Sequence, residues 1–150
     1  MLFRSGLPPR VTVSDLPRES ETQKQLNLGL TPALAADVQR RRTNIEAVLF
    51  DDMARSQLPD GSFDGVVAVE VLEHVEEDEQ FVRHVQRVLR PGGWFLMSTP
   101  NGDYLPNRNP DHKRHYKRAQ LAALLARHFP AVEVEYAILG GRFRRMGLEA

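Results

Sequence analysis

The stretch that most constrains the fold spans residues 63–100. It begins with a nearly continuous apolar run, residues 66–69, which is typical of a strand buried on both faces of a parallel sheet. Apolar residues at helical spacing follow over residues 78–90, and a Pro-Gly-Gly segment ends that pattern. A second apolar run, residues 94–97, leads into a polar turn. The stretch therefore predicts one strand–helix–strand unit, whose crossover we expect to be right-handed.

Polar side chains follow both predicted strands. Residues 70–74 come directly after the first strand, and residues 98–101 come after the second. Ligands of open parallel sheets bind beyond the carboxyl ends of the strands. We therefore expect these two corners to lie side by side at the ligand site.

Length and composition narrow the class of protein. A chain of 150 residues with 41% hydrophobic residues predicts one globular domain. The 20 basic and 20 acidic residues balance, so the charge gives no reason to expect nucleic acid as a partner. The sequence has no cysteine, which excludes disulfides, thiolate metal sites and a cysteine nucleophile. No apolar stretch reaches membrane-spanning length and no signal peptide is evident, so we expect a cytoplasmic protein.

Two segments carry a resemblance to a known family. FDGVVAVEVLEHV (residues 63–75) and VLRPGGWFLMSTPN (residues 88–101) resemble the second half of class I S-adenosylmethionine-dependent methyltransferases. The most similar group is the small-molecule methyltransferases that include the quinone O-methyltransferases. The resemblance implies a Rossmann-like α/β fold, with a mostly parallel sheet and helices on both faces. It also implies methyl transfer from S-adenosylmethionine to a small-molecule acceptor, with oxygen as the favoured acceptor atom.

The resemblance also implies positions for the cofactor. Residues 11–15 are β-branched and end in an acid, which predicts a short strand. Family members end their second strand with an acid that hydrogen-bonds the ribose hydroxyls, and Asp15 occupies the matching position. On the residues alone, Asp15 has a second interpretation, as the cap of its Asp-Leu-Pro turn. Asp52 and Met53 match the family's adenine contacts after the third strand, here residues 45–50. The expected cofactor-binding residues are Asp15, Asp52, Met53, Val69 and Glu70.

Two roles are open for the acidic corner after the first strand of the central unit. The unperturbed pKa of histidine, about 6.5, suits proton transfer at neutral pH, which makes His74 a candidate base for an acceptor hydroxyl. Quinone O-methyltransferases with a similar Glu-x-x-Glu-His pattern are thought to bind a divalent metal, so Glu70, Glu73 and His74 are candidate Mg²⁺ ligands. Alternatively, these acids only favour the start of the following helix.

The polar stretch of residues 102–117 is too long for an ordinary connection, and such loops are usually functional or mobile. Its end resembles the family's segment that caps the acceptor pocket, and a solvated loop face is the alternative. The spacing of its histidines does not favour a zinc site. The expected substrate-binding residues are Asn101, Tyr104, His112, His115 and Tyr116.

The remaining pattern predicts the flanking elements and one gap. A helix is expected at residues 31–42, with Thr31 as its N-cap and Pro32 at the first helical position. A second helix is expected at residues 118–128, and a half-exposed, antiparallel edge strand at residues 131–139. The family's glycine-rich cofactor loop has no counterpart here, because its first strand would lie upstream of Met1. We therefore expect a truncated or degenerate domain. Three outcomes are open: the chain is a fragment of a longer gene product, its remaining strands pair directly, or a partner such as a second copy supplies the strand. The alternative function is a non-catalytic module that binds a ligand or partner. A nicotinamide-dependent dehydrogenase is disfavoured, because it too needs a glycine-rich loop.

Overall fold

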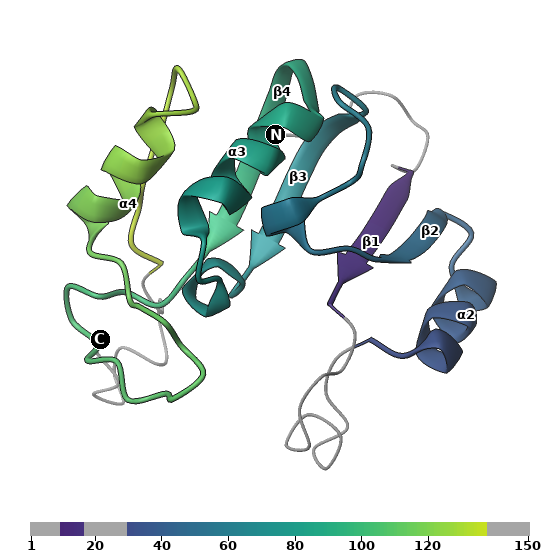
Figure 1. Cartoon of the computed structure of the whole chain (residues 1–150), viewed down its shortest axis with the longest axis horizontal. Helices are drawn as coiled ribbons and strands as arrows, with labels where there is room; N and C mark the ends of the chain where they lie inside the picture. Colours follow the sequence, from purple (N-terminus) through teal and green to yellow (C-terminus); the bar gives the residue numbers. More distant parts are fainter. Residues whose placement is uncertain (1–9, 17–29, 138–150) are drawn as a thin grey trace. The chain divides into compact units, whose positions relative to one another are not determined.

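The computed structural model describes residues 10–16 and 30–137 (Figure 1). The chain forms two compact units, Met1–Asp52 and Met53–Ala150, which we call the N-terminal unit and the C-terminal unit. The described strands form two separate two-stranded sheets, β1–β2 and β3–β4, and both pairs are parallel. The predicted α/β class with parallel strands is therefore confirmed.

The N-terminal unit contains β1 (Val11–Asp15), α2 (Pro32–Arg41) and β2 (Ile45–Phe50). Both strands have the bounds that the sequence predicts. The Thr31 side chain accepts a hydrogen bond from the Leu34 backbone N–H at 3.1 Å, and Pro32 occupies the first helical position. The helix therefore starts where the sequence predicts it, and it ends one residue earlier.

The C-terminal unit contains the central strand–helix–strand. Its elements are the 3₁₀ turn η1 (Met53–Arg55), β3 (Phe63–Val69), the 3₁₀ turn η2 (Leu72–His74), α3 (Asp78–Val88), β4 (Leu89–Ser98) and α4 (Arg118–Ala126). Acids occupy the first turn of α3 and Arg87 its last turn, and these charges interact favourably with the helix dipole. Strand β4 starts at Leu89, directly after α3, rather than after the glycines. The pairing register shifts between Phe63 and Gly65, because the Pro-Gly-Gly segment bulges out of β4.

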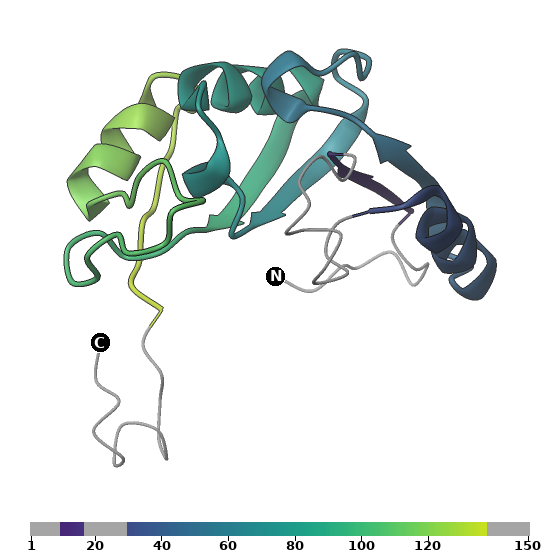
Figure 2. The same cartoon turned by 60° about the horizontal axis from the view of Figure 1, so that its bottom comes forward.

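One face of β3–β4 carries the core of this unit. Phe81, Val82 and Val85 of α3 and Leu121 and Leu124 of α4 are buried in one cluster. Ala68 of β3 belongs to the same cluster, and Val66, Phe95 and Met97 from this face of the two strands pack against it. Figure 2 shows α3 and α4 on the same side of these strands.

The opposite face of β3–β4 is open to solvent. Val67 is 56% exposed, Val69 65% and Leu96 60%, and the register places these side chains together. The expectation that residues 66–69 are buried on both faces therefore differs from the structure, because the helices described in this unit cover one face of the pair.

Residues 131–137 differ from the predicted edge strand. No strand is assigned there, although the alternation of burial is present. Val132 and Val134 pack against the core, while Glu133 and Glu135 are exposed. The alternating pattern is therefore satisfied by packing rather than by strand pairing. Residues 138 and 139 of the predicted strand lie outside the described residues.

No helix in the described ranges combines the length and the apolar character needed to cross a bilayer.

Candidate functional site

The carboxyl ends of β3 and β4 meet at one corner of the C-terminal unit. The Glu70 backbone N–H donates to the Ser98 carbonyl at 3.1 Å, and the Ser98 hydroxyl donates to Glu70 Oε1 at 2.8 Å. Glu70 has a φ of 52°, in the left-handed region that a side chain with a Cβ rarely adopts. Such backbone conformations concentrate at functional sites. The predicted meeting of residues 70–74 with residues 98–101 is confirmed.

Glu73 is the buried carboxylate of this corner. It lies on η2 and has no exposed surface. Its Oε2 accepts a hydrogen bond from the Thr99 hydroxyl at 3.0 Å, whereas its Oε1 has no hydrogen-bond partner. The Glu73 carbonyl also accepts from the Lys113 N–H at 2.7 Å, which fastens the polar loop of residues 102–117 to the corner.

Three histidines gather where that loop reaches η2. The rings of His74 and His112 meet edge to face with centroids 4.5 Å apart. His74 Nδ1 lies 3.2 Å from the Asp111 carbonyl, and His115 Nδ1 lies 3.0 Å from the Leu105 carbonyl. Because a carbonyl only accepts hydrogen bonds, both Nδ1 atoms carry the proton. In the neutral form of these two rings, the Nε2 atoms are therefore the acceptors.

The contact between His112 and His115 also fixes the tautomer of the third ring, that of His112. His112 Nδ1 lies 2.9 Å from His115 Nε2. Since His115 Nε2 is an acceptor, His112 Nδ1 donates the hydrogen bond, and the lone pair of His112 stays on its Nε2. His74 and His112 thus both have a proton-accepting Nε2.

The other expected substrate residues have different surroundings. Tyr116 is buried, and its hydroxyl donates to Asp78 Oδ2 at 2.7 Å. Burial and this hydrogen bond raise the pKa of Tyr116. Tyr104 is 62% exposed and packs against Tyr136, while Asn101 bridges to Tyr116. The structure therefore groups His112 and His115 with the corner at the ends of β3 and β4, and it places Tyr116 in the core.

The expected cofactor residues occupy strand ends in both units. In the N-terminal unit, Asp15 ends β1, and its Oδ1 accepts from the Leu16 N–H at 2.8 Å, as in the turn-capping alternative. Asp52 follows β2 in the same unit. In the C-terminal unit, Met53 opens η1, and Val69 ends β3 beside Glu70.

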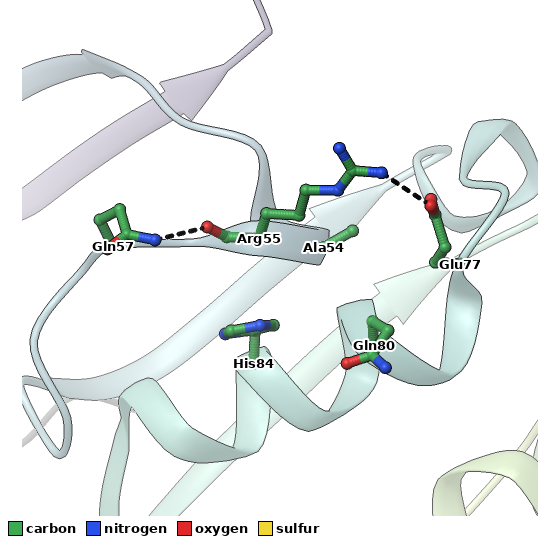
Figure 3. A pocket seen from close by; sticks show the side chains of 6 residues that line it. All are labelled: Ala54, Arg55, Gln57, Glu77, Gln80 and His84. Atoms are coloured by element: carbon green, nitrogen blue, oxygen red, sulfur yellow. Dashed lines mark hydrogen bonds and ion pairs between the residues drawn. The ribbon is translucent and has the colours of Figure 1, made fainter.

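A pocket of about 460 Å³ lies elsewhere in the C-terminal unit, between η1 and α3 (Figure 3). Arg55 spans it and pairs with Glu77 at 2.9 Å, and the Gln57 side chain donates to the Arg55 carbonyl at 3.1 Å. His84 and Gln80 of α3 line its other side. None of the residues expected to bind a ligand lines this pocket.

From the sequence alone, Glu73 and His74 are expected to act together after the first strand of the central unit, and His112 is expected in a separate group in the polar loop. The structure brings them together, with one potential metal-ligand atom of each within 4.8 Å of the others. Glu70, expected as a third ligand, is not in this group. No local pattern signals the contact, because 37 residues separate His74 from its hydrogen-bond partner Asp111.

Parallel strands joined by a crossover helix, with polar residues at their carboxyl ends, define a Rossmann-like α/β protein. A family model described as "Methyltransferase domain" matches residues 19–97. The chain belongs to this methyltransferase family, as its resemblance implied.

Among curated proteins, the chain is 39% identical over 108 residues to a probable S-adenosylmethionine-dependent methyltransferase of Mycolicibacterium smegmatis, covering 69% of this chain and 42% of that protein. It is 32% identical over 135 residues to a ubiquinone biosynthesis O-methyltransferase of Xanthomonas oryzae pv. oryzae, covering 79% and 52%. The chain thus spans about two fifths of the first relative and about half of the second.

Solved structures agree on the fold. The [4+2]-cyclase SpnF matches with a TM-score of 0.59 and 26% identity, covering 80% of this chain and 42% of that one. An S-adenosylmethionine-dependent methyltransferase from Mesorhizobium loti matches with a TM-score of 0.52 over 66% of this chain and 59% of its own, at 21% identity.

Proposed function

We propose that the chain transfers the methyl group of S-adenosylmethionine to a hydroxyl oxygen of a small molecule. Membership of the methyltransferase family supports the donor, and similarity to proteins named ubiquinone biosynthesis O-methyltransferase supports an oxygen acceptor. The observation that carries the proposal is the 3.2 Å contact of His74 Nδ1 with the Asp111 carbonyl, beyond the carboxyl end of β3. This contact leaves Nε2 of the neutral ring free to accept the hydroxyl proton.

In the proposed reaction, the acceptor oxygen attacks the methyl carbon while the bond from carbon to the sulfonium sulfur breaks. The hydroxyl proton passes to His74 Nε2, and S-adenosylhomocysteine leaves. Holding the two reactants in line supplies most of the rate gain. The Asp111 carbonyl keeps the imidazole in the correct tautomer by accepting from Nδ1.

The same proposal assigns the remaining contacts. Val69 and Glu70, at the end of β3, contact the cofactor, and Asp15, Asp52 and Met53 keep the roles that the family implies. His112, His115, Asn101 and Tyr104 contact the acceptor. Tyr116 is left out of the acceptor contacts, because its hydroxyl is committed to Asp78 inside the core.

Mg²⁺ does not fit the donors at this corner. The cluster of potential ligands holds one carboxylate and two imidazoles, whereas Mg²⁺ prefers oxygen ligands. Glu70, the second expected carboxylate, accepts a hydrogen bond from Ser98 instead. The proposed reaction therefore has no step that uses Mg²⁺.

Methyl transfer to a dihydroxybenzene, followed by mass spectrometry of the product, tests this function. We expect His74→Gln to lower kcat by roughly 10²–10⁴-fold, the usual contribution of a general base. His84→Gln is the matched control, because His84 lies on α3 in the pocket of Figure 3. Equal rates for the wild type and His74→Gln would contradict the role of His74. If the wild type gave no methylated product with any hydroxylated acceptor, the function itself would be contradicted.

Other expectations stay predictions. These are the cytoplasmic location, the lack of a nucleic-acid partner and a homo-oligomeric state.

A further inference from the structure

We propose that Asn109, in the polar loop of residues 102–117, is a positioning residue for the proposed base His74. The inference rests on the proposed function, because it explains how the chain keeps the imidazole in the tautomer that the reaction needs. His74 Nδ1 lies 3.2 Å from the Asp111 carbonyl. The direction of that carbonyl therefore decides whether the neutral ring keeps its proton on Nδ1 and its lone pair on Nε2.

Residues 109–112 form a β-turn, and their sequence, Asn-Pro-Asp-His, is typical of one. The His112 N–H donates to the Asn109 carbonyl at 3.1 Å, which is the hydrogen bond that closes such a turn. Asparagine is favoured at the first position of a β-turn and proline at the second. The Asn109 side chain adds a second bond, because its Oδ1 accepts from the Asp111 N–H at 3.0 Å.

This turn sets the direction of the Asp111 carbonyl. The Asp111 carbonyl and the His112 N–H belong to one peptide unit, and in a trans peptide they point in opposite directions. No cis peptide bond occurs among the described residues. Because the Asn109 carbonyl holds the His112 N–H on one side, the Asp111 carbonyl points away from the turn, toward His74 Nδ1. The Asn109 side chain holds the preceding peptide unit through the Asp111 N–H. One residue therefore fixes the peptide units on both sides of Asp111.

Two further contacts hold the loop beside η2, the element that carries the proposed base. The Lys113 N–H donates to the Glu73 carbonyl at 2.7 Å, and Arg114 Nη2 donates to the Glu76 carbonyl at 2.9 Å. Both contacts lie after the turn in the sequence. They bring the turn close to η2, whereas the bonds within the turn orient the carbonyl that faces the imidazole.

Loss of the Asn109 side chain should act on the reaction through His74. Without Oδ1, the peptide unit before Asp111 loses one of its two restraints, so the Asp111 carbonyl is held less firmly at Nδ1. A neutral imidazole without a fixed partner populates both tautomers, and the tautomer with its proton on Nε2 cannot accept the hydroxyl proton. Asn109 is exposed, so its substitution should leave the fold intact.

Long-range ¹H–¹⁵N spectra of the full chain, recorded without cofactor at a pH where the ring is neutral, show which nitrogen of His74 carries the proton. His74→Gln identifies the signal. We expect the proton on Nδ1 in the wild type and a mixture of tautomers in Asn109→Ala. Asn109→Gln should behave like Asn109→Ala, because its longer side chain does not close this turn. Asn109→Asp should restore the wild-type tautomer, because its carboxylate keeps an acceptor for the Asp111 N–H.

Gln120→Ala is the matched control. Gln120 Oε1 accepts from the Lys117 N–H at 3.0 Å, so the variant loses the same kind of hydrogen bond elsewhere in the C-terminal unit. We expect it to leave the His74 signal unchanged. A wild-type tautomer in both Asn109→Ala and Asn109→Gln would overturn the proposal, as would an equal change in Gln120→Ala.

Methyl transfer to the dihydroxybenzene gives the second readout. Asn109→Ala should lower kcat by roughly 3–10-fold, the effect of one lost hydrogen bond, with an unchanged KM for S-adenosylmethionine. Asn109→Asp should recover most of this loss. An unchanged kcat in Asn109→Ala would overturn the proposal. A wild type that transfers no methyl group would instead contradict the proposed function, and the two failures are distinguishable because the tautomer is measured without cofactor.

Discussion

Asp78 connects the polar loop to the helix that supports the site. Its Oδ2 accepts from the Tyr116 hydroxyl at 2.7 Å and pairs with Arg114 Nη1 at 2.6 Å. Burial opposes ionisation of this carboxyl, but the hydrogen bonds from Tyr116 and Arg114 outweigh it and lower the pKa of Asp78. The charged form of Asp78 is therefore favoured in the folded state and fastens the loop to the start of α3.

This lowered pKa predicts a dependence of stability on pH. An unfolded aspartate titrates near pH 3.9, and folded Asp78 titrates lower, so its contribution is complete above that pH and is lost as the pH falls through the folded pKa. Asp78→Asn should cost about 1.5–3 kcal/mol at neutral pH, as expected for hydrogen bonds to a charged group. It should also make the acid limb of the stability curve shallower.

Urea unfolding of Asp78→Asn between neutral and acidic pH measures both effects. Asp64→Asn is the control, because Asp64 forms an exposed ion pair with Arg90. An acid limb as steep as that of the wild type would contradict the role of Asp78.

At the scale of elements, the pairing of β3 with β4 favours a glycine at position 65. Gly65 lies opposite Trp94 in the parallel register, and a Cβ added to Gly65 would lie 2.3 Å from the Trp94 ring. The ring therefore lies directly over the Gly65 backbone. Because Trp94 is 40% exposed, it can swing away from a larger residue.

Gly65→Ala should displace the Trp94 ring and cost about 1–3 kcal/mol, the usual effect of an extra methyl group in a tight contact. Trp94 is the chain's single tryptophan, so its fluorescence reports on this contact alone. We expect a red-shifted emission from Gly65→Ala. In the Trp94→Leu background, the same substitution should cost less. An unchanged emission spectrum in Gly65→Ala would show that the ring does not occupy this position.

The elements that the sequence predicts well are those whose bounds are set by residues close to them in the sequence. β1 and β2 have the expected bounds, and α2 starts at its predicted cap. The structure differs from the expectation where the bounds of an element depend on the strand it pairs with or on the side chains that pack against it. Leu89 joins β4 without a loop, and residues 131–137 show strand-like alternation of burial without strand pairing. Hydrophobic periodicity reports which side chains are buried, but it does not report what covers them.

At the scale of the whole molecule, topology predicted part of the site. The rule for parallel strands correctly predicted that Glu70 and Ser98 lie together, because both stand at the carboxyl ends of strands of one crossover unit. The left-handed φ of Glu70 and the contact of His74 with His112 had no signal in the sequence. The polar loop makes that contact, and its path depends on long-range hydrogen bonds such as that from Lys113 to Glu73.

The fold alone does not determine the reaction. A [4+2]-cyclase and a methyltransferase both match this chain with TM-scores above 0.5. The function therefore depends on what the corner at the end of β3 binds, and the cofactor is the most informative ligand.

Titration of the ¹⁵N-labelled full chain with S-adenosylmethionine, followed by amide resonances, tests this point most directly. We predict saturable shifts of the Val69 and Glu70 amides, at the carboxyl end of β3, with much smaller shifts around the pocket at Arg55 and His84. Glu70→Ala should weaken the binding. Unchanged Val69 and Glu70 signals at millimolar S-adenosylmethionine would contradict the assignment of this corner to a methyltransferase site.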